Sequence, residues 1–379
     1  MTVPGPNLPV LLLQSVEVSS ERGSSFVIDE LGDEWRDLCS RSQNEEPFFR
    51  PEWIGAYLRA FEPAAKMLVT TVRRQRRLHL VLPLIEEKAT LGGVPVRRLR
   101  SPANSHPGRF DLVCLPDADG ESAIRLAWQH LKKREHWDLL ELRNVPEGGV
   151  CDRLVALARA DGLATVTAPT RPNPCVFLPG STEGLGALPR NARLRTKLRQ
   201  ARRELGTDLR FHCVEAPKRE ALERFFELEQ SGWKGEQKSA IKSASHTLNF
   251  YIEIADSAGR FGYFSLYLLE WKGQLLAGHF SLRHRGRCYS PKVAYSETFD
   301  RFVPGHLIVQ EILRDCSERG VRAFDITGPD DDWKLKWTSD VRRMNDHYIF
   351  KGKLGALAHT VRFGIRPKLV RVFRRLGKT

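Results

Sequence analysis

The sequence predicts a mixed α+β fold of two tandem domains, each with a mostly antiparallel mixed sheet flanked by helices. The chain has 379 residues, which is long for one hydrophobic core and sufficient for two. Hydrophobic residues make up 41% of it and charged residues 28%, so the chain should fold. The two halves also share a similar order of expected helices and strands, which suggests an internal duplication.

The second half shows this order more clearly. A helix is expected over 189–206, because Leu194, Leu198, Ala201 and Leu205 form one apolar stripe and Gly206 is a typical stop. Tight turns at Lys272-Gly273 and Gly286 separate three later strands. The elements expected after the first helix are a strand at 208–215, helices at 217–233 and 243–259, strands at 261–270, 274–284 and 287–295, a helix at 304–319, and strands at 321–327 and 346–352.

The first half repeats the pattern more weakly. The expected elements are helices at 32–42 and 50–61, a hairpin of strands at 66–74 and 78–87, a third strand at 94–102, a helix at 121–136, a strand at 137–145, a helix at 149–161, and strands near 163–168 and 174–178. Proline and glycine around 172–189 mark a junction. We therefore expect one domain at 1–180, a second at 181–355 and a basic amphipathic tail at 356–379.

Charge and cysteine content restrict the class of protein. The net charge of +14 favours an acidic partner, such as a phosphate-bearing ligand, nucleic acid or an anionic membrane. The 7 cysteines are dispersed and show no metal-binding spacing, which predicts reduced thiols, no metal site and a cytoplasmic location. Neither a signal peptide nor a membrane-spanning run is expected.

Six stretches carry a resemblance to a known family. They are "RPEWIGAYLRAF" (50–61), "LPL" (82–84), "RLRTKLRQARRELG" (193–206), "LEQSGWKG" (228–235), "KVAYSETFDRFVPGHLI" (292–308) and "FDITGPDDDWKLKW" (324–337). With this element order, roughly residues 25–355 resemble the two-domain GNAT proteins described as BioF-like or CelD-type (cellulose-biosynthesis) acetyltransferases, relatives of the FemAB peptidyltransferases.

The resemblance implies transfer of an acyl group, from acetyl-CoA or another acyl-CoA, to an amine acceptor in polysaccharide or cell-envelope synthesis. Two motifs differ from the family pattern. Phe302-Val303-Pro304-Gly305 stands where GNAT proteins carry R/Q-x-x-G-x-G/A, and Lys238-Ser239 stands where many relatives have Gly-Thr. Two alternatives remain: a FemAB-like transferase that uses aminoacyl-tRNA, and a non-catalytic protein with a GNAT-like core that binds nucleic acid or a membrane.

The donor phosphates are expected at the start of the helix that follows residue 303. The first N–H groups of a helix have no internal acceptor and can bind an anion. Proline is favourable at the first helical position, and glycine permits close approach. We assign this role to Pro304, Gly305, His306 and Leu307, with Lys292 as a further phosphate contact; an ordinary turn is the alternative.

Four residues are candidates for proton transfer. Glu229 flanks an apolar helix face, where burial would raise the pKa of its carboxyl group. Asp325 ends a strand beside a glycine-containing loop, and His279 alternates with apolar neighbours on an expected strand. Tyr295 is the candidate acid that returns a proton to the thiolate, a role that the resemblance implies. Solvent-exposed or purely structural roles are the alternatives for the other three.

Aromatic and basic residues complete the expected site. Trp233 and Lys234 follow a helix end and are candidates for the acceptor wall and an anion contact. In "WKLKW", Trp333 and Lys334 are further substrate-binding candidates. Residues 362–379 carry 7 basic residues and no acidic one, with apolar residues on one face, which predicts docking on the protein itself or peripheral contact with the inner face of an anionic membrane.

Overall fold

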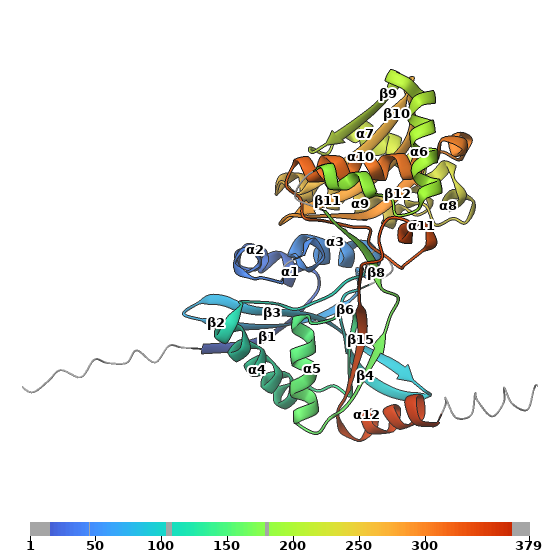
Figure 1. The fold of residues 1–379 in the computed structure, drawn as a ribbon. Coiled ribbons are helices and arrows are strands. Elements are labelled where there is room, and N and C mark those ends of the chain that lie inside the picture. Colours follow the sequence, from blue (N-terminus) through green and yellow to red (C-terminus); the bar gives the residue numbers. More distant parts are fainter. Residues whose placement is uncertain (1–15, 45, 104–107, 179–181, 366–379) are drawn as a thin grey trace, which may run out of the picture.

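The computed structural model describes residues 16–365, except 45, 104–107 and 179–181, and contains two sheets with helices packed on them (Figure 1). This confirms the predicted mixed α+β class. In both sheets most neighbouring strands run antiparallel. The parallel pairs are β4 with β6 in the first sheet and β12 with β13 in the second.

The first sheet has eight strands in the order β1-β2-β3-β4-β6-β15-β7, with β5 paired to β3. Its strands are β1 (Val16–Gly23), β2 (Lys66–Arg74), β3 (Arg77–Leu91), β4 (Val94–Arg100), β5 (Val113–Cys114), β6 (Leu139–Pro146), β7 (Ala164–Pro169) and β15 (Met344–Phe350). The expected strands from the first half are present. β1 was not expected, because its sequence "VEVSSERG" is mostly polar.

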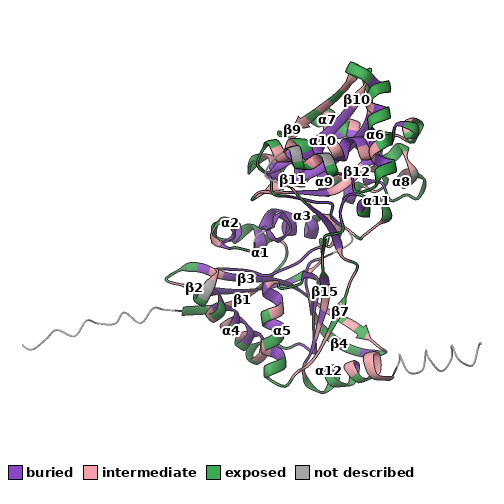
Figure 2. Ribbon diagram, viewed as in Figure 1, coloured by how far each residue is buried: buried purple, intermediate pink, exposed green. Residues whose placement is uncertain are grey.

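Helices cover both faces of this sheet. The helices of the first half are α1 (Phe26–Glu30), α2 (Gly32–Arg41), α3 (Pro51–Phe61), α4 (Asp117–Arg134) and α5 (Val150–Ala160), with the short η1 (Pro47–Phe49). Helices α4 and α5 lie on the face away from the second sheet, and α1–α3 lie between the two sheets (Figure 1). Figure 2 shows α3 buried along most of its length, which its residues Pro51 to Leu58 confirm.

The second sheet has seven strands in the order β14-β8-β13-β12-β11-β10-β9. Its strands are β8 (Asn173–Phe177), β9 (Leu209–Val214), β10 (Phe264–Trp271), β11 (Gln274–His284), β12 (Arg287–Tyr295), β13 (Ala323–Asp325) and β14 (Val341–Arg342). The helices of this half are α6 (Ala192–Leu205), α7 (Arg219–Ser231), α8 (Trp233–Glu236), α9 (Ser245–Arg260), α10 (Pro304–Glu318) and α11 (Asp332–Leu335), with the short η2 (Thr182–Ala187), η3 (Gly206–Asp208), η4 (Ile241–Ser243) and η5 (Glu297–Phe302).

The two halves exchange strands across the expected boundary at residue 180. Strand β8 precedes the boundary but pairs with β13 and β14 in the second sheet. Strand β15 comes from the second half but lies between β6 and β7 in the first sheet. Sheet membership therefore differs from the expected division, because hydrogen-bond partners far apart in the chain do not show in local sequence patterns.

One hydrophobic core also joins the halves. It contains Trp53 and Ile54 of α3 together with Phe250 and Tyr251 of α9. The Trp53 and Phe250 rings meet edge to face, with centroids 5.1 Å apart. The halves therefore pack as one body rather than as two independent units.

The chain continues past β15 into α12 (Gly352–His359), which packs against β4, and a further helical turn η6 (Thr360–Ile365). The expected tail is thus helical as far as it is described, and its residues 366–379 lie outside the described part. No helix among the described residues is both long enough and apolar enough to cross a membrane.

We predict that β15 stabilises the first half although it comes from the second. Ile349 is fully buried in the core under the first sheet. Replacing it in Ile349→Ala should lower the free energy of unfolding by about 2–5 kcal/mol, because the truncation leaves a cavity. Chemical denaturation measures this. The control Leu357→Ala, at a side chain that is 50% exposed, should change stability by no more than about 0.5 kcal/mol. Equal effects of the two substitutions would contradict the prediction.

Candidate active site

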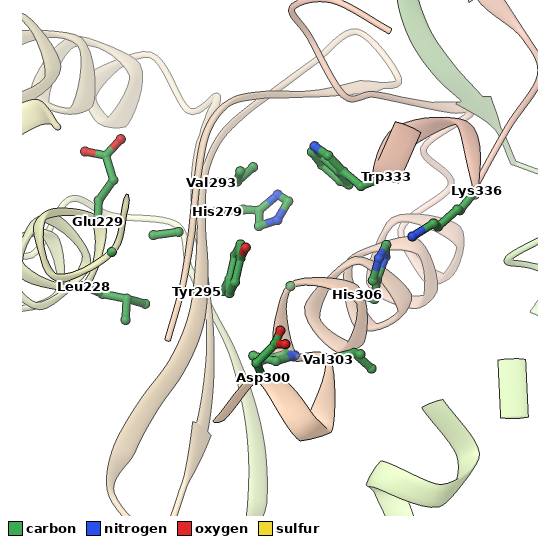
Figure 3. Close-up of a pocket in the computed structure, with 14 residues that line it drawn as sticks. Leu228, Glu229, His279, Val293, Tyr295, Asp300, Val303, His306, Trp333 and Lys336 are labelled. Atoms are coloured by element: carbon green, nitrogen blue, oxygen red, sulfur yellow. The ribbon is translucent and has the colours of Figure 1, made fainter. Parts of the chain in front are cut away.

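The second sheet opens where β12 and β13 stop pairing. Their parallel ladder covers only Arg287 to Tyr289 on β12 and ends at Asp325 on β13. Strand β12 continues alone on that side to Tyr295. A cavity of about 370 Å³ lies at this opening (Figure 3). Its lining residues are Leu228, Glu229, Gly232, His279, Val293, Ala294, Tyr295, Asp300, Val303, Pro304, Gly305, His306, Trp333 and Lys336.

Helix α10 begins at this cavity as predicted, with Pro304 at its first position. Val303 before it has a left-handed backbone (φ 47°, ψ 51°), which is strained for a β-branched residue. The carbonyl of Val303 accepts the N–H groups of both His306 and Leu307. Pro304 has no N–H, so within the first turn of α10 only Gly305 keeps an N–H without a protein acceptor. The anion site is therefore smaller than the four-residue cradle expected from the sequence, and Leu307 is buried outside the cavity lining.

Gly305 is needed for close packing at this point. A Cβ atom at residue 305 would lie 3.2 Å from Cδ1 of Tyr295, tighter than ordinary van der Waals contact. The Tyr295 ring therefore lies directly on the first turn of α10. Burial, and then the carboxylates of Glu297 and Asp300, raise the pKa of Tyr295, so this phenol keeps its proton at neutral pH. It can act as a proton donor in the cavity.

His306 presents a neutral imidazole to the cavity. Its Nδ1 accepts a hydrogen bond of 3.0 Å from the indole N–H of Trp337. Because an indole nitrogen only donates, Nδ1 carries no proton and the neutral ring has its proton on Nε2. Burial and then the nearby Lys336 lower the pKa of His306 to about 4. The residue therefore offers a hydrogen-bond donor rather than a positive charge.

His279 reaches the same cavity from β11. It is 1% exposed, and its Nδ1 lies 2.7 Å from the hydroxyl oxygen of Ser290 on β12. Figure 3 shows His279 and Tyr295, from neighbouring strands, around the same space as His306 and Trp333. His279 and Tyr295, two of the four proton-transfer candidates from the sequence, thus line the same cavity.

Glu229 and Lys292 form a separate pair on the α7 side of the sheet. The Glu229 carboxylate accepts the N–H of Ile241 at 2.7 Å, and its other oxygen lies 3.7 Å from the Lys292 ammonium. The Lys292 ammonium also lies over the Tyr251 ring. Glu229 reaches the cavity wall, but Lys292 is not among the lining residues. Strand alternation places Lys292 on the opposite face of β12 from α10, where we had expected it to meet a phosphate.

Asp325 lies outside the cavity, in an ion-pair network between the two halves. Its Oδ1 accepts hydrogen bonds from Arg109 at 2.7 Å and from the Thr327 N–H at 3.0 Å, and its Oδ2 is 3.7 Å from Arg342. Burial alone would raise the pKa of Asp325, but Arg109 and Arg342 hold it below its usual value. A carboxylate stabilised in its charged form by two cations is a weak base, so its position favours a structural role.

The "WKLKW" segment divides between structure and cavity. Trp333 lines the cavity as expected. The Lys334 ammonium instead donates to the carbonyls of Thr327 at 2.7 Å and Pro329 at 2.8 Å, which holds the preceding loop. Lys336 supplies the cation at the cavity wall. Residues 233 and 234 are in α8, but the side chains of Trp233 and Lys234 lie outside the described part of the structure.

Three contributors to the site were missed from the sequence: Ser290, Val303 and Asp300. Pro291 lies within the β12 sequence and cannot donate to a ladder hydrogen bond, which was a usable sign of an irregularity in this strand. The left-handed Val303 gave no sign, because a β-branched residue is a poor match for that conformation. The carboxylate of Asp300 reaches the cavity only because η5 folds back before α10.

Comparison with known proteins concerns the second half first. Residues 192–335 match the family model described as an acetyltransferase (GNAT) domain. No curated protein sequence matches the chain. Among solved structures, FemX aligns with a TM-score of 0.60 at 13% identity, covering 87% of this chain and 98% of FemX.

Two lysylphosphatidylglycerol synthetase structures align across both halves as well. The C-terminal domain of a putative enzyme from Agrobacterium fabrum gives a TM-score of 0.51 at 12% identity, covering 89% of this chain and 99% of that one. The structure from Bacillus licheniformis aligns with a TM-score of 0.51 at 12% sequence identity, covering 87% of this chain and 95% of that one. At these identities the likeness concerns the fold. Residues 192–335 are similar to the GNAT acetyltransferase domain, and the fold of the chain is shared with these proteins.

We predict that His306 makes the protein less stable below pH 6.5. Its folded-state pKa is about 4, below the usual value of 6.5, so the unfolded chain binds a proton that the folded chain does not. The free energy of unfolding should be highest above pH 6.5 and should decrease towards pH 4 as the unfolded chain takes up this proton. The decrease at pH 5 should be about 1–2 kcal/mol. Denaturation of wild type and His306→Asn at pH 7 and 5 measures it. Equal pH dependence in both proteins would contradict the prediction.

Proposed function

We propose that the protein is an N-acyltransferase that moves an acyl group from an acyl-CoA thioester to an amine. The observation that carries this proposal is the cavity at the open end of β12, where His279, Tyr295 and the start of α10 meet. Each step of acyl transfer has a candidate group there. The matched GNAT domain covers all of these residues and supports the assignment.

The candidate roles follow from the positions of these groups at the cavity. The attacking amine must lose a proton, and His279 is the buried imidazole available for it at the cavity. The oxyanion that forms on the acyl carbonyl needs donors, which the Nε2–H of His306 and the N–H of Gly305 can provide. Collapse of that intermediate breaks the C–S bond, and Tyr295, which holds its proton at neutral pH, can protonate the leaving thiolate.

Recognition of the donor phosphates is assigned to Lys336. Lys336 is an exposed cation at the cavity wall beside the start of α10. The basic helix α6 is linked to Lys336 by hydrogen bonds. Its Arg195 side chain donates to the carbonyls of Pro189 and Arg190. The N–H of Arg190 donates in turn to the carbonyl of Lys336. The acceptor is an amine, and a polysaccharide or envelope precursor remains our proposal for the molecule that carries it.

We predict that Lys336→Ala weakens acyl-CoA binding by about tenfold, since one charge-assisted hydrogen bond contributes roughly 1.5–3 kcal/mol. Calorimetric titration of acetyl-CoA into wild type and mutant measures it. Lys353→Ala, at an exposed lysine of α12, is the matched control and should bind like wild type. Failure of wild type to bind acetyl-CoA and longer acyl-CoA at millimolar concentration would exclude this donor class.

A second donor, an aminoacyl ester of tRNA, is favoured by one feature of the same cavity. The Asp300 carboxylate reaches the space beside the start of α10, where it would repel a diphosphate but attract the ammonium group of an aminoacyl donor. The lysylphosphatidylglycerol synthetases named above make an aminoacylated lipid by name. Filter binding of charged against uncharged tRNA tests this donor, and selective retention of charged tRNA would favour it over acyl-CoA.

We also propose that the C-terminal end contacts an anionic membrane. Helix α12 leaves Leu354 44% and Leu357 50% exposed, beside the cation Lys353. The basic sequence 362–379 continues from it.

We predict that the full chain sediments with vesicles containing phosphatidylglycerol but not with purely zwitterionic vesicles, and that 0.5 M salt weakens this binding. A chain ending at residue 361 should lose it. Unchanged binding after the deletion would contradict the proposal.

A further inference from the structure

The first half of the chain reaches the candidate base His279 through a continuous series of buried hydrogen bonds. The series begins at Arg109, which precedes β5, and ends at the imidazole on β11. None of its intermediate members lines the cavity.

The first contact depends on a β-bulge in β12. Phe280 of β11 pairs with Lys292 and Leu282 pairs with Tyr289, so Ser290 and Pro291 together oppose the single residue Ser281. A bulge of this kind redirects a side chain out of its regular alternation. Ser290 is 2% exposed, and its hydroxyl lies 2.7 Å from Nδ1 of His279. Through this contact Ser290 restrains the His279 ring at Nδ1.

The second contact fixes the backbone of Ser290. Its carbonyl accepts a hydrogen bond of 2.7 Å from the Thr327 hydroxyl, at the point where β13 has left the sheet and offers no ladder partner. Thr327 has a positive φ of 27°, an unfavourable conformation for a β-branched residue. Lys334 holds it through its carbonyl, and Asp325 holds it through its N–H.

The third contact crosses between the halves. The Arg109 guanidinium donates to Asp325 Oδ1 at 2.7 Å, the same oxygen that accepts the Thr327 N–H. Both side chains are buried, with Arg109 2% and Asp325 0% exposed. Glu46 and Arg342 complete the charge balance. The Arg109 guanidinium also lies over the ring of Tyr289, the residue before Ser290.

We propose that Arg109 is a positioning residue for acyl transfer: acting through Asp325, Thr327 and Ser290, it fixes the orientation of the His279 ring. The first half then serves catalysis without contributing a residue to the cavity at this point. This inference rests on the proposed role of His279. Ring orientation matters because proton transfer requires a nitrogen within hydrogen-bond reach of the amine, and a rotated ring loses that alignment.

The test is a double-mutant cycle with Arg109→Gln and Thr327→Val, each measured alone and together. Thr327→Val removes the hydroxyl while keeping the shape, and Thr327→Ser restores it. Arg59→Gln is the matched control, because Arg59 forms another ion pair between the halves, with Glu253, away from this series. The readouts are kcat, KM for the donor, and the ring ¹⁵N shifts of His279, assigned by comparison with His279→Gln.

Arg109→Gln and Thr327→Val should each lower kcat about tenfold with KM unchanged, and shift the His279 nitrogens. The kcat of the double variant should be no lower than that of the more impaired single variant, because both substitutions act on the same series of hydrogen bonds. Thr327→Ser and Arg59→Gln should resemble wild type. Additive losses, or His279 shifts that stay unchanged in both single variants, would overturn the proposal.

The ¹⁵N measurement keeps this test separate from the test of function. It needs no substrate, so it reports coupling between Arg109 and His279 even if no donor supports turnover. Coupled shifts with no acyl transfer would reject the proposed function alone. Acyl transfer with uncoupled shifts would reject the positioning role alone. If Arg109→Gln does not fold, Thr327→Val against Thr327→Ser still decides whether the series reaches His279.

Discussion

The buried ion pair between Arg109 and Asp325 is the interaction on which much of the remaining architecture depends. Two buried charges are costly to remove from water, and the cost is offset here by close pairing and by the second acid and second arginine, Glu46 and Arg342. Removing one partner from such a network usually costs several kcal/mol, because the other charge stays buried without compensation. The pair also fixes the end of β13, which forms one border of the sheet opening.

The exchange of β8 and β15 also joins the two halves of the chain, through backbone hydrogen bonds. Each sheet contains a strand from the other half of the chain, so separating the halves would break backbone hydrogen bonds in both sheets. The shared core around Trp53 and Phe250 adds apolar contact between them. A GNAT-like domain match limited to residues 192–335 therefore describes only part of a unit whose two halves share both sheets and one core. The alignment with FemX across 87% of the chain agrees with this view.

The chemistry of the cavity follows from where regular structure stops. The β12–β13 ladder ends at Tyr289, a bulge follows at Ser290-Pro291, and Val303 turns the chain into α10. These interruptions expose a helix start, two strand side chains and a loop to one small space. The first turn of α10 satisfies most of its own N–H groups, so recognition of a donor falls to Gly305, His306 and Lys336 rather than to a broad backbone cradle.

Most of the elements were predictable from the sequence because they depend on local properties. The leucine stripe of α6 is buried as expected, and Pro304 begins α10 as its missing N–H favours. His279, Tyr295 and Trp333 were identified because their residue types and strand or loop positions suit a site.

Other features depended on contacts that no local pattern contains. The sequence suggested that Lys292 contacts a phosphate, but Lys292 pairs with Glu229. It suggested that Lys334 contacts the substrate, but Lys334 donates to the loop carbonyls of Thr327 and Pro329. Asp325 was a candidate base from the sequence, but in the structure it accepts a hydrogen bond from Arg109, 216 residues away in the chain. Local sequence thus determined most of the helices and strands and the start of α10. Only the tertiary structure decided which charges face the cavity and which are neutralised, because the partner of a buried charge is chosen by packing between distant segments.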